Sequence, residues 1–94
     1  MSFESYVISL ENMKKTDNKS VQIMTKYEKS RIIGTRATAL AYDAPPYVDT
    51  IGMKSTIDIA KKELKEKVIP YIIRRRFPND KFEDWQIKDL IIPM

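Results

Sequence analysis

The positions of the five prolines constrain the fold of this chain more than any other feature. None occurs before Pro45, which is followed at once by Pro46, and the others are Pro70, Pro78 and Pro93. Proline removes a backbone donor and disfavours helical geometry in the residue before it, so each one limits the elements around it. The chain can therefore hold one long helix before Pro45 and a shorter one between Pro46 and Pro70.

The first helix has a clear start. Thr25 and Glu28 have the spacing of a capping box, in which each side chain binds the other residue's amide, so the sequence predicts a helix over 25–42. Gly34 lies in its middle, where it costs up to ~1 kcal/mol relative to alanine. We expect close packing to offset that cost, by a neighbouring helix or by another chain, along a row of small residues: Ser30, Gly34, Ala37 and Ala41.

The rest of the chain alternates between turns and short elements. A loop is expected over 43–54, and Ser55 is placed to cap a helix over 55–67. After Pro70 the hydrophobic period changes to two, which predicts a β-hairpin over 71–87 and leaves an apolar tail over 88–94.

Residues 1–24 have the composition of an extension. A short apolar run, Phe3–Leu10, precedes a polar stretch, Asn12–Ser20, and so few apolar residues cannot fold alone. We expect this segment to become ordered on a partner, with one domain over 25–94. The expected fold class is mainly α with a short C-terminal β-hairpin, a small α+β domain.

Composition excludes most catalytic chemistry. The chain has no cysteine and no histidine, and its two glycines form no phosphate-binding loop. No apolar run approaches the ~18 residues of a membrane span. The carboxylates near other polar groups have no acid–base or metal-ligating companion, so we expect no catalytic, cofactor or metal site: Asp43, Asp58, Glu83 and Asp84.

The net charge of +4 is concentrated in residues 61–76, which include the three arginines Arg74–Arg76. Such a patch can meet phosphate or an acidic protein surface. One hypothesis is a free-standing basic module that binds single-stranded nucleic acid, with Tyr71, Phe77 and Trp85 stacking on bases. The alternative is that these aromatic residues anchor the hairpin, whose arginines it cannot bury by itself and which then pair with carboxylates of a partner.

The run Thr25–Ala37, followed by Ala44-Pro45, resembles the first motif of the omega-like small subunit of multisubunit DNA-directed RNA polymerases. That family includes the common subunit of eukaryotic nuclear polymerases, archaeal subunit K and bacterial omega. Segments similar to its second half follow in order, so the resemblance covers about residues 25–90: Ile59–Leu64, Ile69-Pro70, Ile73–Arg75 and Phe82–Trp85.

The resemblance implies a non-catalytic subunit that binds the largest polymerase subunit and promotes assembly and stability. It implies a hetero-oligomer with other polymerase subunits, no cofactor, no membrane, and DNA and RNA met only through the complex. The residues carried over as an expected subunit interface are Lys26, Tyr27, Arg31, Gly34, Thr35, Arg36, Pro45, Arg74, Arg75 and Trp85.

Some positions depart from the family pattern. Residues 1–24 are short and electrically balanced, Ser55-Thr56 stands where relatives often have Asp-Pro, and Asp80 stands where the turn often has glycine. These departures favour a large DNA virus encoding its own polymerase as the source, ahead of an archaeal or divergent cellular polymerase. The expected location is intracellular, in the polymerase complex: host cytoplasm or virion if viral, nucleus if cellular and eukaryotic.

Overall fold

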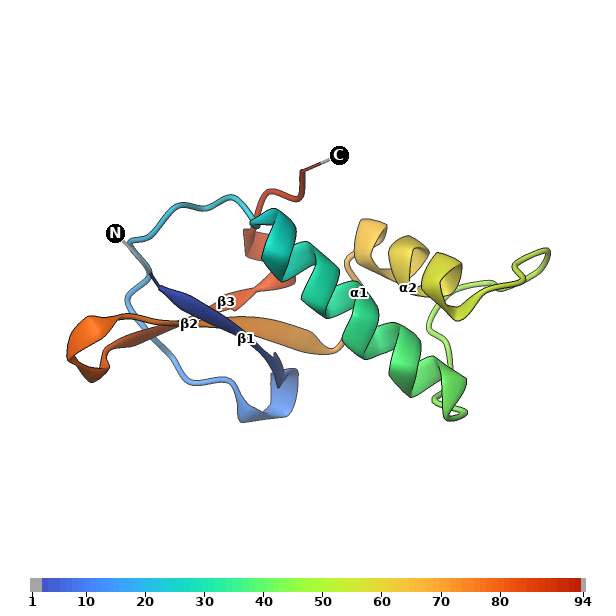
Figure 1. Ribbon diagram of the computed structural model, residues 1–94, viewed down its shortest axis with the longest axis horizontal. Helices are drawn as coiled ribbons and strands as arrows, with labels where there is room; N and C mark the ends of the chain where they lie inside the picture. The colour runs from blue at the N-terminus through green and yellow to red at the C-terminus, as the bar shows by residue number, and fades with distance from the viewer. Residues whose placement is uncertain (1–2, 94) are drawn as a thin grey trace.

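A three-stranded antiparallel sheet and two α-helices make up the part of the chain that the computed structural model describes, residues 3–93. The elements in chain order are β1 (Glu4–Ser9), α1 (Lys26–Ala41), α2 (Thr56–Lys65), β2 (Tyr71–Arg76) and β3 (Phe82–Gln86). The molecule is elongated, 45 × 26 × 17 Å, with the sheet at one end and α2 with the preceding loop at the other (Figure 1).

Helix α1 begins where its capping residues predict. Thr25 Oγ1 accepts the Glu28 amide at 3.0 Å, and Glu28 Oε1 accepts the Thr25 amide at 2.9 Å, which confirms the capping box. The helix ends at Ala41, and Asp43 then adopts a left-handed φ of 71°. The chain therefore leaves the helix before it reaches the two adjacent prolines.

Helix α2 is shorter than the expected range of 55–67. Its N-cap is Ser55, whose hydroxyl accepts the Ile57 amide at 3.1 Å, and its last residue is Lys65. Lys67 has a left-handed φ of 57°, and the Val68 amide bonds back to the Glu63 carbonyl at 3.1 Å. This turn ends the helix two residues before the expected end at residue 67.

The expected fold class is correct as α+β but wrong about the sheet. The hairpin β2–β3 is present, yet β1 from the other end of the chain pairs with β2, from Glu4 opposite Arg76 to Ser9 opposite Tyr71. A two-stranded hairpin is marginal by itself, and a third strand supplies the missing pairing. Strands thus lie at both ends of the sequence, and the helices are not dominant.

The segment after β1 wraps around the sheet. Residues 13–24, here called the strap, pass over Asp84 of the edge strand β3, where the Lys14 amide donates to its carboxylate at 2.8 Å. Thr16 Oγ1 accepts the Asp84 amide at 2.9 Å, and Asn18 Nδ2 donates to the Asp84 carbonyl at 2.8 Å. The strap therefore satisfies an exposed sheet edge, which is otherwise open to pairing with another chain.

The expectation that residues 1–24 need a partner has to be revised for the described residues 3–24. The apolar run forms β1 and the polar stretch forms the strap, both bound to the same chain. A polar segment can be ordered by hydrogen bonds that a hydrophobic pattern does not reveal. Further ordering of this segment by another subunit stays a prediction, and its first two residues lie outside the described part of the chain.

The hydrophobic core lies between α1, α2 and the face of the sheet that carries Ile73. Its buried members are Met24, Ile32, Leu64, Ile69, Ile73, Trp85, Ile87 and Leu90. The tail contributes Leu90, only 1% exposed, and the backbone of Ile91 bridges to Ile23 in the strap. Part of the expected apolar tail is thus buried by the chain itself.

Candidate subunit interface

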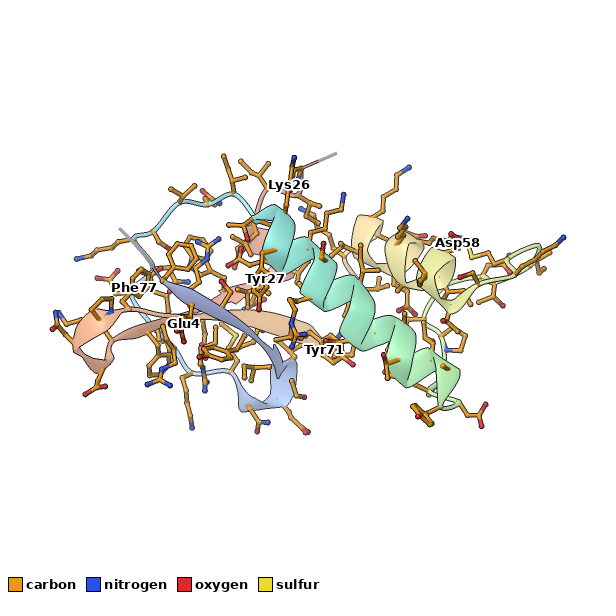
Figure 2. All side chains as sticks on the ribbon, in the orientation of Figure 1. Glu4, Lys26, Tyr27, Asp58, Tyr71 and Phe77 are labelled. Carbon is orange, nitrogen blue, oxygen red and sulfur yellow. The ribbon has the colours of Figure 1, made fainter. Side chains whose placement is uncertain are left out.

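The residues expected at a subunit interface do not lie together on one surface. Figure 2 shows Lys26 and Tyr27 on the first turn of α1. The exposed members of the set are Lys26, Tyr27, Arg31, Gly34, Thr35 and Pro45. The buried or half-buried members are Arg36, Arg74, Arg75 and Trp85.

Arg75 forms an ion pair inside the chain. Its Nε and Nη2 donate to the two carboxylate oxygens of Glu28 at 2.8 and 2.9 Å, and both side chains are 0% exposed. The remaining donors bind the strap: Nη1 donates to Ser20 Oγ at 2.9 Å and to the Val21 carbonyl at 2.5 Å, and Nη2 donates to the Ile23 carbonyl at 3.0 Å. The expectation that the hairpin's arginines stay unburied without a partner is therefore wrong for Arg75, because α1 and the strap enclose it.

The carboxylate of Glu28 is ionised in this setting. Burial by itself raises the pKa of Glu28, but hydrogen bonds from Arg75, from the Ser5 hydroxyl and from the Thr25 amide outweigh it, so the pKa is lowered. Ser5 Oγ donates to Glu28 at 2.5 Å from strand β1. One carboxylate thus holds together β1, the start of α1 and the central strand β2.

Arg74 points to the opposite face of the sheet and pairs with Asp84 across the strands. Its Nε and Nη2 donate to the two Asp84 oxygens at 2.8 and 2.9 Å. Burial raises the pKa of Asp84, but the bonds from Arg74 and from the Lys14 amide prevail and lower it, while the same pair raises the pKa of Arg74. The charge of Arg74 is therefore neutralised within the hairpin.

Glu83 and Trp85 also have internal partners. The Glu83 carboxylate accepts the Lys19 amide at 2.9 Å, Ser20 Oγ at 2.6 Å and the Trp85 indole N–H at 2.9 Å. Burial raises the pKa of Glu83, but the hydrogen bonds from Ser20, the Lys19 amide and the Trp85 indole outweigh it and lower the pKa overall. Trp85 is only 7% exposed and belongs to the core, so its ring is not available to stack on a base.

A third ion pair joins the two helices. Arg36 Nε and Nη2 donate to the Glu63 oxygens at 2.6 and 3.2 Å, and these side chains are 5% and 0% exposed. Arg36 Nη2 also donates to the Pro45 carbonyl at 2.8 Å, and Glu63 accepts the Tyr47 amide at 2.8 Å. Two members of the expected interface, Arg36 and Pro45, are thus in contact, and their contact positions the loop after α1.

The sequence analysis missed the acidic partners of these arginines. The local spacing predicts only a capping role for Glu28 and marks no distant partner for Glu63. Both lie on the apolar sides of their helices: Glu28 is four residues before Ile32, and Glu63 is three residues after Ala60, and both of these neighbours are buried. A carboxylate on the apolar side of a helix signals a buried ion pair, because an unpaired one would be too costly to bury.

The exposed part of α1 forms a continuous row, here called the outer row: Tyr27, Arg31, Gly34, Thr38 and Tyr42. Tyr27 is 60% exposed and Tyr42 is 82% exposed, and a Cβ added at Gly34 would meet no atom within 4 Å. No helix of the described chain packs against Gly34, so the expectation of a neighbouring helix is wrong, and packing by another chain stays a prediction. Of the four small residues only Ala37 is buried. The outer row thus has an exposed tyrosine at each end and open space at Gly34 in its middle.

Other kinds of site find no support in the described residues. Residues 3–93 contain no group of three or more acidic side chains placed to hold a metal ion. None of the helices in this range is long and apolar enough to cross a membrane. The four carboxylates considered in the sequence analysis are either exposed, as Asp43 and Asp58 are, or engaged in the hydrogen bonds described above.

The sequence model of a family described as RNA polymerase Rpb6 matches residues 20–71, which include α1 and α2. The Saccharomyces cerevisiae protein named DNA-directed RNA polymerases I, II, and III subunit RPABC2 is 49% identical over 71 residues, 76% of this chain and 46% of the relative. The Schizosaccharomyces pombe protein of the same name is 44% identical over 77 residues, 82% and 54% of the two chains.

A plant relative gives the same result. The Arabidopsis thaliana protein named DNA-directed RNA polymerases II and V subunit 6B is 42% identical over 74 residues, 79% of this chain and 51% of the relative. The chain therefore spans about half the length of the curated relatives it matches. The outer row lies entirely within the segment that the family model matches.

Proposed function

The chain belongs to the RNA polymerase Rpb6 family, and from this premise we propose that it is a non-catalytic subunit of a DNA-directed RNA polymerase. The resemblance carried by Thr25–Ala37 is confirmed by the family match. In the proposed role the chain binds the largest polymerase subunit and promotes assembly and stability of the enzyme. It then acts inside the polymerase complex and meets DNA and RNA only through that complex.

The outer row of α1 is the observation that carries this proposal. Tyr27 and Tyr42 supply large exposed rings, and tyrosine is enriched at protein interfaces because it buries much area at low entropic cost. Between them Gly34 has no side chain, which allows a partner backbone to approach the helix closely. A solvent-exposed glycine in the middle of a helix is unfavourable for the free chain, and a docked partner offsets that disadvantage.

The buried arginines have a different part in this proposal. Arg36, Arg74 and Arg75 pair with carboxylates of the same chain, so they hold the fold that presents the outer row. The same pairs weigh against the alternative of a free-standing module for single-stranded nucleic acid. That module uses Arg74–Arg76 with Tyr71, Phe77 and Trp85. Of these, Arg74, Arg75 and Trp85 are engaged inside the chain.

The test is reconstitution with the largest polymerase subunit from the same source. Gly34→Leu places a bulky side chain where the free chain has open space, so we expect the thermal midpoint of the isolated chain to stay within a few degrees of wild type. Association with the largest subunit, measured by co-purification and by titration, should weaken at least tenfold because the leucine blocks close approach.

Lys81→Leu, in the exposed hairpin turn at the other end of the molecule, is the matched control and should associate normally. Tyr27→Ala should weaken association as Gly34→Leu does. Normal association of a folded Gly34→Leu chain would remove the outer row from the interface. Failure of the wild-type chain to associate with the largest subunit would refute the proposed function itself.

A further inference from the structure

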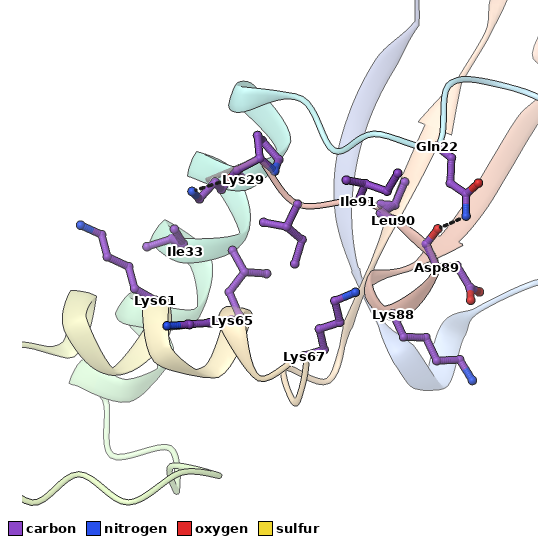
Figure 3. Close-up of a pocket in the computed structure, with 13 residues that line it drawn as sticks. Gln22, Lys29, Ile33, Lys61, Lys65, Lys67, Lys88, Asp89, Leu90 and Ile91 are labelled. Atoms are coloured by element: carbon purple, nitrogen blue, oxygen red, sulfur yellow. Dashed lines mark hydrogen bonds between the residues drawn. The ribbon is translucent and has the colours of Figure 1, made fainter.

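A groove lies on the side of the molecule where α1, α2 and the C-terminal tail meet, and it has a volume of about 640 Å³ (Figure 3). Its lining is of two kinds. Apolar residues form one part: Ile33, Leu64, Leu90, Ile91, Ile92 and Pro93. Lysines form the other: Lys29, Lys61, Lys65, Lys67 and Lys88.

The apolar part of the groove extends to the open surface. Leu64 and Leu90 are 1% exposed and form its floor, whereas Ile91 is 59% exposed at its edge. Ile23 of the strap, which bridges to Ile91, is 48% exposed. Exposed isoleucines beside a concave apolar floor are typical of a surface that another molecule covers.

The lysines make the groove strongly basic. With Asp89 as the acidic member of the lining, the five lysines give it a formal charge of +4, equal to the net charge of the whole chain. None of them forms an ion pair with a carboxylate of the described residues, and Lys29 Nζ instead donates to the Pro93 carbonyl at 2.9 Å. The arginines Arg36, Arg74 and Arg75 are paired internally, whereas the groove lysines keep their charge for a partner.

The groove and the outer row are on different sides of α1. Successive helical residues are separated by about 100°, so Lys29 lies roughly 200° around the axis from Tyr27, and Ile33 lies roughly 200° from Arg31. A subunit that covers the outer row therefore leaves the groove accessible.

We propose that this groove binds an acidic peptide segment of a second protein, with apolar side chains seated on the floor and carboxylates facing the lysines. This goes beyond docking on the largest subunit and does not depend on it. The described lining contains no aromatic ring on which a base could stack and no arginine that could hold a phosphate with two bonds. An apolar floor inside a ring of lysines matches a peptide with both acidic and apolar residues.

The test is selection from a displayed library of random peptides on the full 94-residue chain, followed by affinity measurement on the enriched peptides. We expect the enriched peptides to combine Asp or Glu with large apolar residues and to perturb the NMR signals of Ile33, Leu64 and Ile91. The Lys61→Glu/Lys65→Glu variant should bind them at least tenfold more weakly. Higher salt should weaken wild-type binding, because part of it is electrostatic.

The matched control is Lys54→Glu/Lys81→Glu, which changes the net charge equally at exposed positions outside the groove. It should bind the enriched peptides like wild type. Enrichment of peptides without carboxylates, or equal losses in both double variants, would overturn the proposal. It would also be overturned if a single-stranded oligo-dT probe bound through Lys61 and Lys65 while no peptide did, since the groove would then serve nucleic acid.

Discussion

The two ends of the molecule differ in how tightly internal contacts hold them and in how exposed their large apolar side chains are. At the sheet end, formed by the three strands and the strap, the charges of Arg74 and Arg75 are paired and the edge of β3 is covered. At the helix end, formed by the last turn of α1, the loop 43–54 and α2, four large apolar side chains stay exposed: Tyr42 at 82%, Tyr47 at 55%, Ile51 at 88% and Ile57 at 49%. The sheet end also exposes apolar side chains of the strap, Val21 at 64% and Ile23 at 48%, but the chain itself pairs these two arginines and covers its strand edge.

This difference separates residues that maintain the fold from residues that meet partners. Each end contains a bidentate arginine–carboxylate pair, but Glu28 and Arg75 connect three elements and the strap, whereas Glu63 and Arg36 connect two helices and a loop. Loss of a pair at the sheet end should therefore unfold the chain, and loss of the pair at the helix end should loosen one region.

The largest effect is expected at the sheet end. Arg75→Ala leaves the Glu28 carboxylate buried without its cation. It removes both hydrogen bonds to Glu28 and all three hydrogen bonds to the strap. Breaking a buried pair in this way typically destabilises a protein by about 3–5 kcal/mol. Denaturant unfolding should show this loss, and a chain of this size would be largely unfolded at physiological temperature.

The neighbouring arginine is the control. Arg76 is exposed, so Arg76→Ala should change the free energy of unfolding by no more than about 0.5 kcal/mol. Equal effects of the two substitutions would mean that the sheet end does not depend on its internal pair. The contrast with the helix end would then have no basis.

At the helix end Arg36→Ala should lower the free energy of unfolding by about 2–4 kcal/mol, because it leaves the Glu63 carboxylate buried without its cation and removes the hydrogen bond to the Pro45 carbonyl. The loss should be local. Hydrogen exchange should accelerate mainly at Tyr47, whose amide bonds to Glu63, and in the loop 43–54. The amides of β2 should exchange no faster than the loss of global stability requires. Uniform acceleration in strands and loop would show that the helix end is not a separate region.

Much of the local structure could be predicted from the sequence. The capping box at Thr25, the cap at Ser55 and the change of period after Pro70 place both helices and the hairpin within a few residues. These signals are local, because each depends on residues only a few positions apart. Short runs such as Thr25–Ala37 were also sufficient to indicate the family.

The parts that could not be predicted depend on long-range polar contacts. The pair of Glu28 with Arg75 spans 47 residues, and the bond of the Lys14 amide to Asp84 spans 70. No hydrophobic period encodes such contacts, so the sequence predicts the polar part of the strap only as an extension that does not fold alone. For the same reason the internal partners of Arg36, Arg74 and Arg75, which the family resemblance places at an interface, could not be predicted.

A smaller effect of the sheet-end pairs should appear in the pH dependence of stability. The folded-state pKa of Asp84 is lowered by Arg74, so this group contributes stability that is present above its unfolded pKa of ~3.9 and is lost as pH falls through the folded value. Asp84→Asn should therefore be less stable than wild type by about 1–3 kcal/mol at pH 7, through the weakened bonds to Arg74 and Lys14.

The difference between the two proteins should shrink as pH falls below about 4, since Asp84 is then protonated first in the unfolded chain and, at lower pH, in the folded chain. Denaturant midpoints collected between pH 7 and pH 2.5 test this. Curves that stay parallel over the whole range would show that the charge of Asp84 contributes nothing to the sheet end, and that its hydrogen bonds act without it.

The smallest effect compares the two glycines, and it tests whether the outer row is shaped for a partner. Both Gly34 and Gly52 have open space where a Cβ would stand, but Gly34 lies within helix α1 and Gly52, in the helix-end loop, has a φ of +80°. Gly34→Ala should therefore stabilise the isolated chain by about 0.5–1 kcal/mol, because alanine restricts the unfolded chain and favours the helix. Gly52→Ala should destabilise it by about 1 kcal/mol, because alanine is strained at positive φ. Thermal unfolding of the two variants measures both.

A stabilised Gly34→Ala chain that associates less well with the largest subunit would mean that Gly34 favours docking at the expense of the free helix. If Gly34→Ala is neither more stable nor weaker in association, the exposed centre of the outer row has no role in binding, and the interface must be sought in the exposed loop of the helix end.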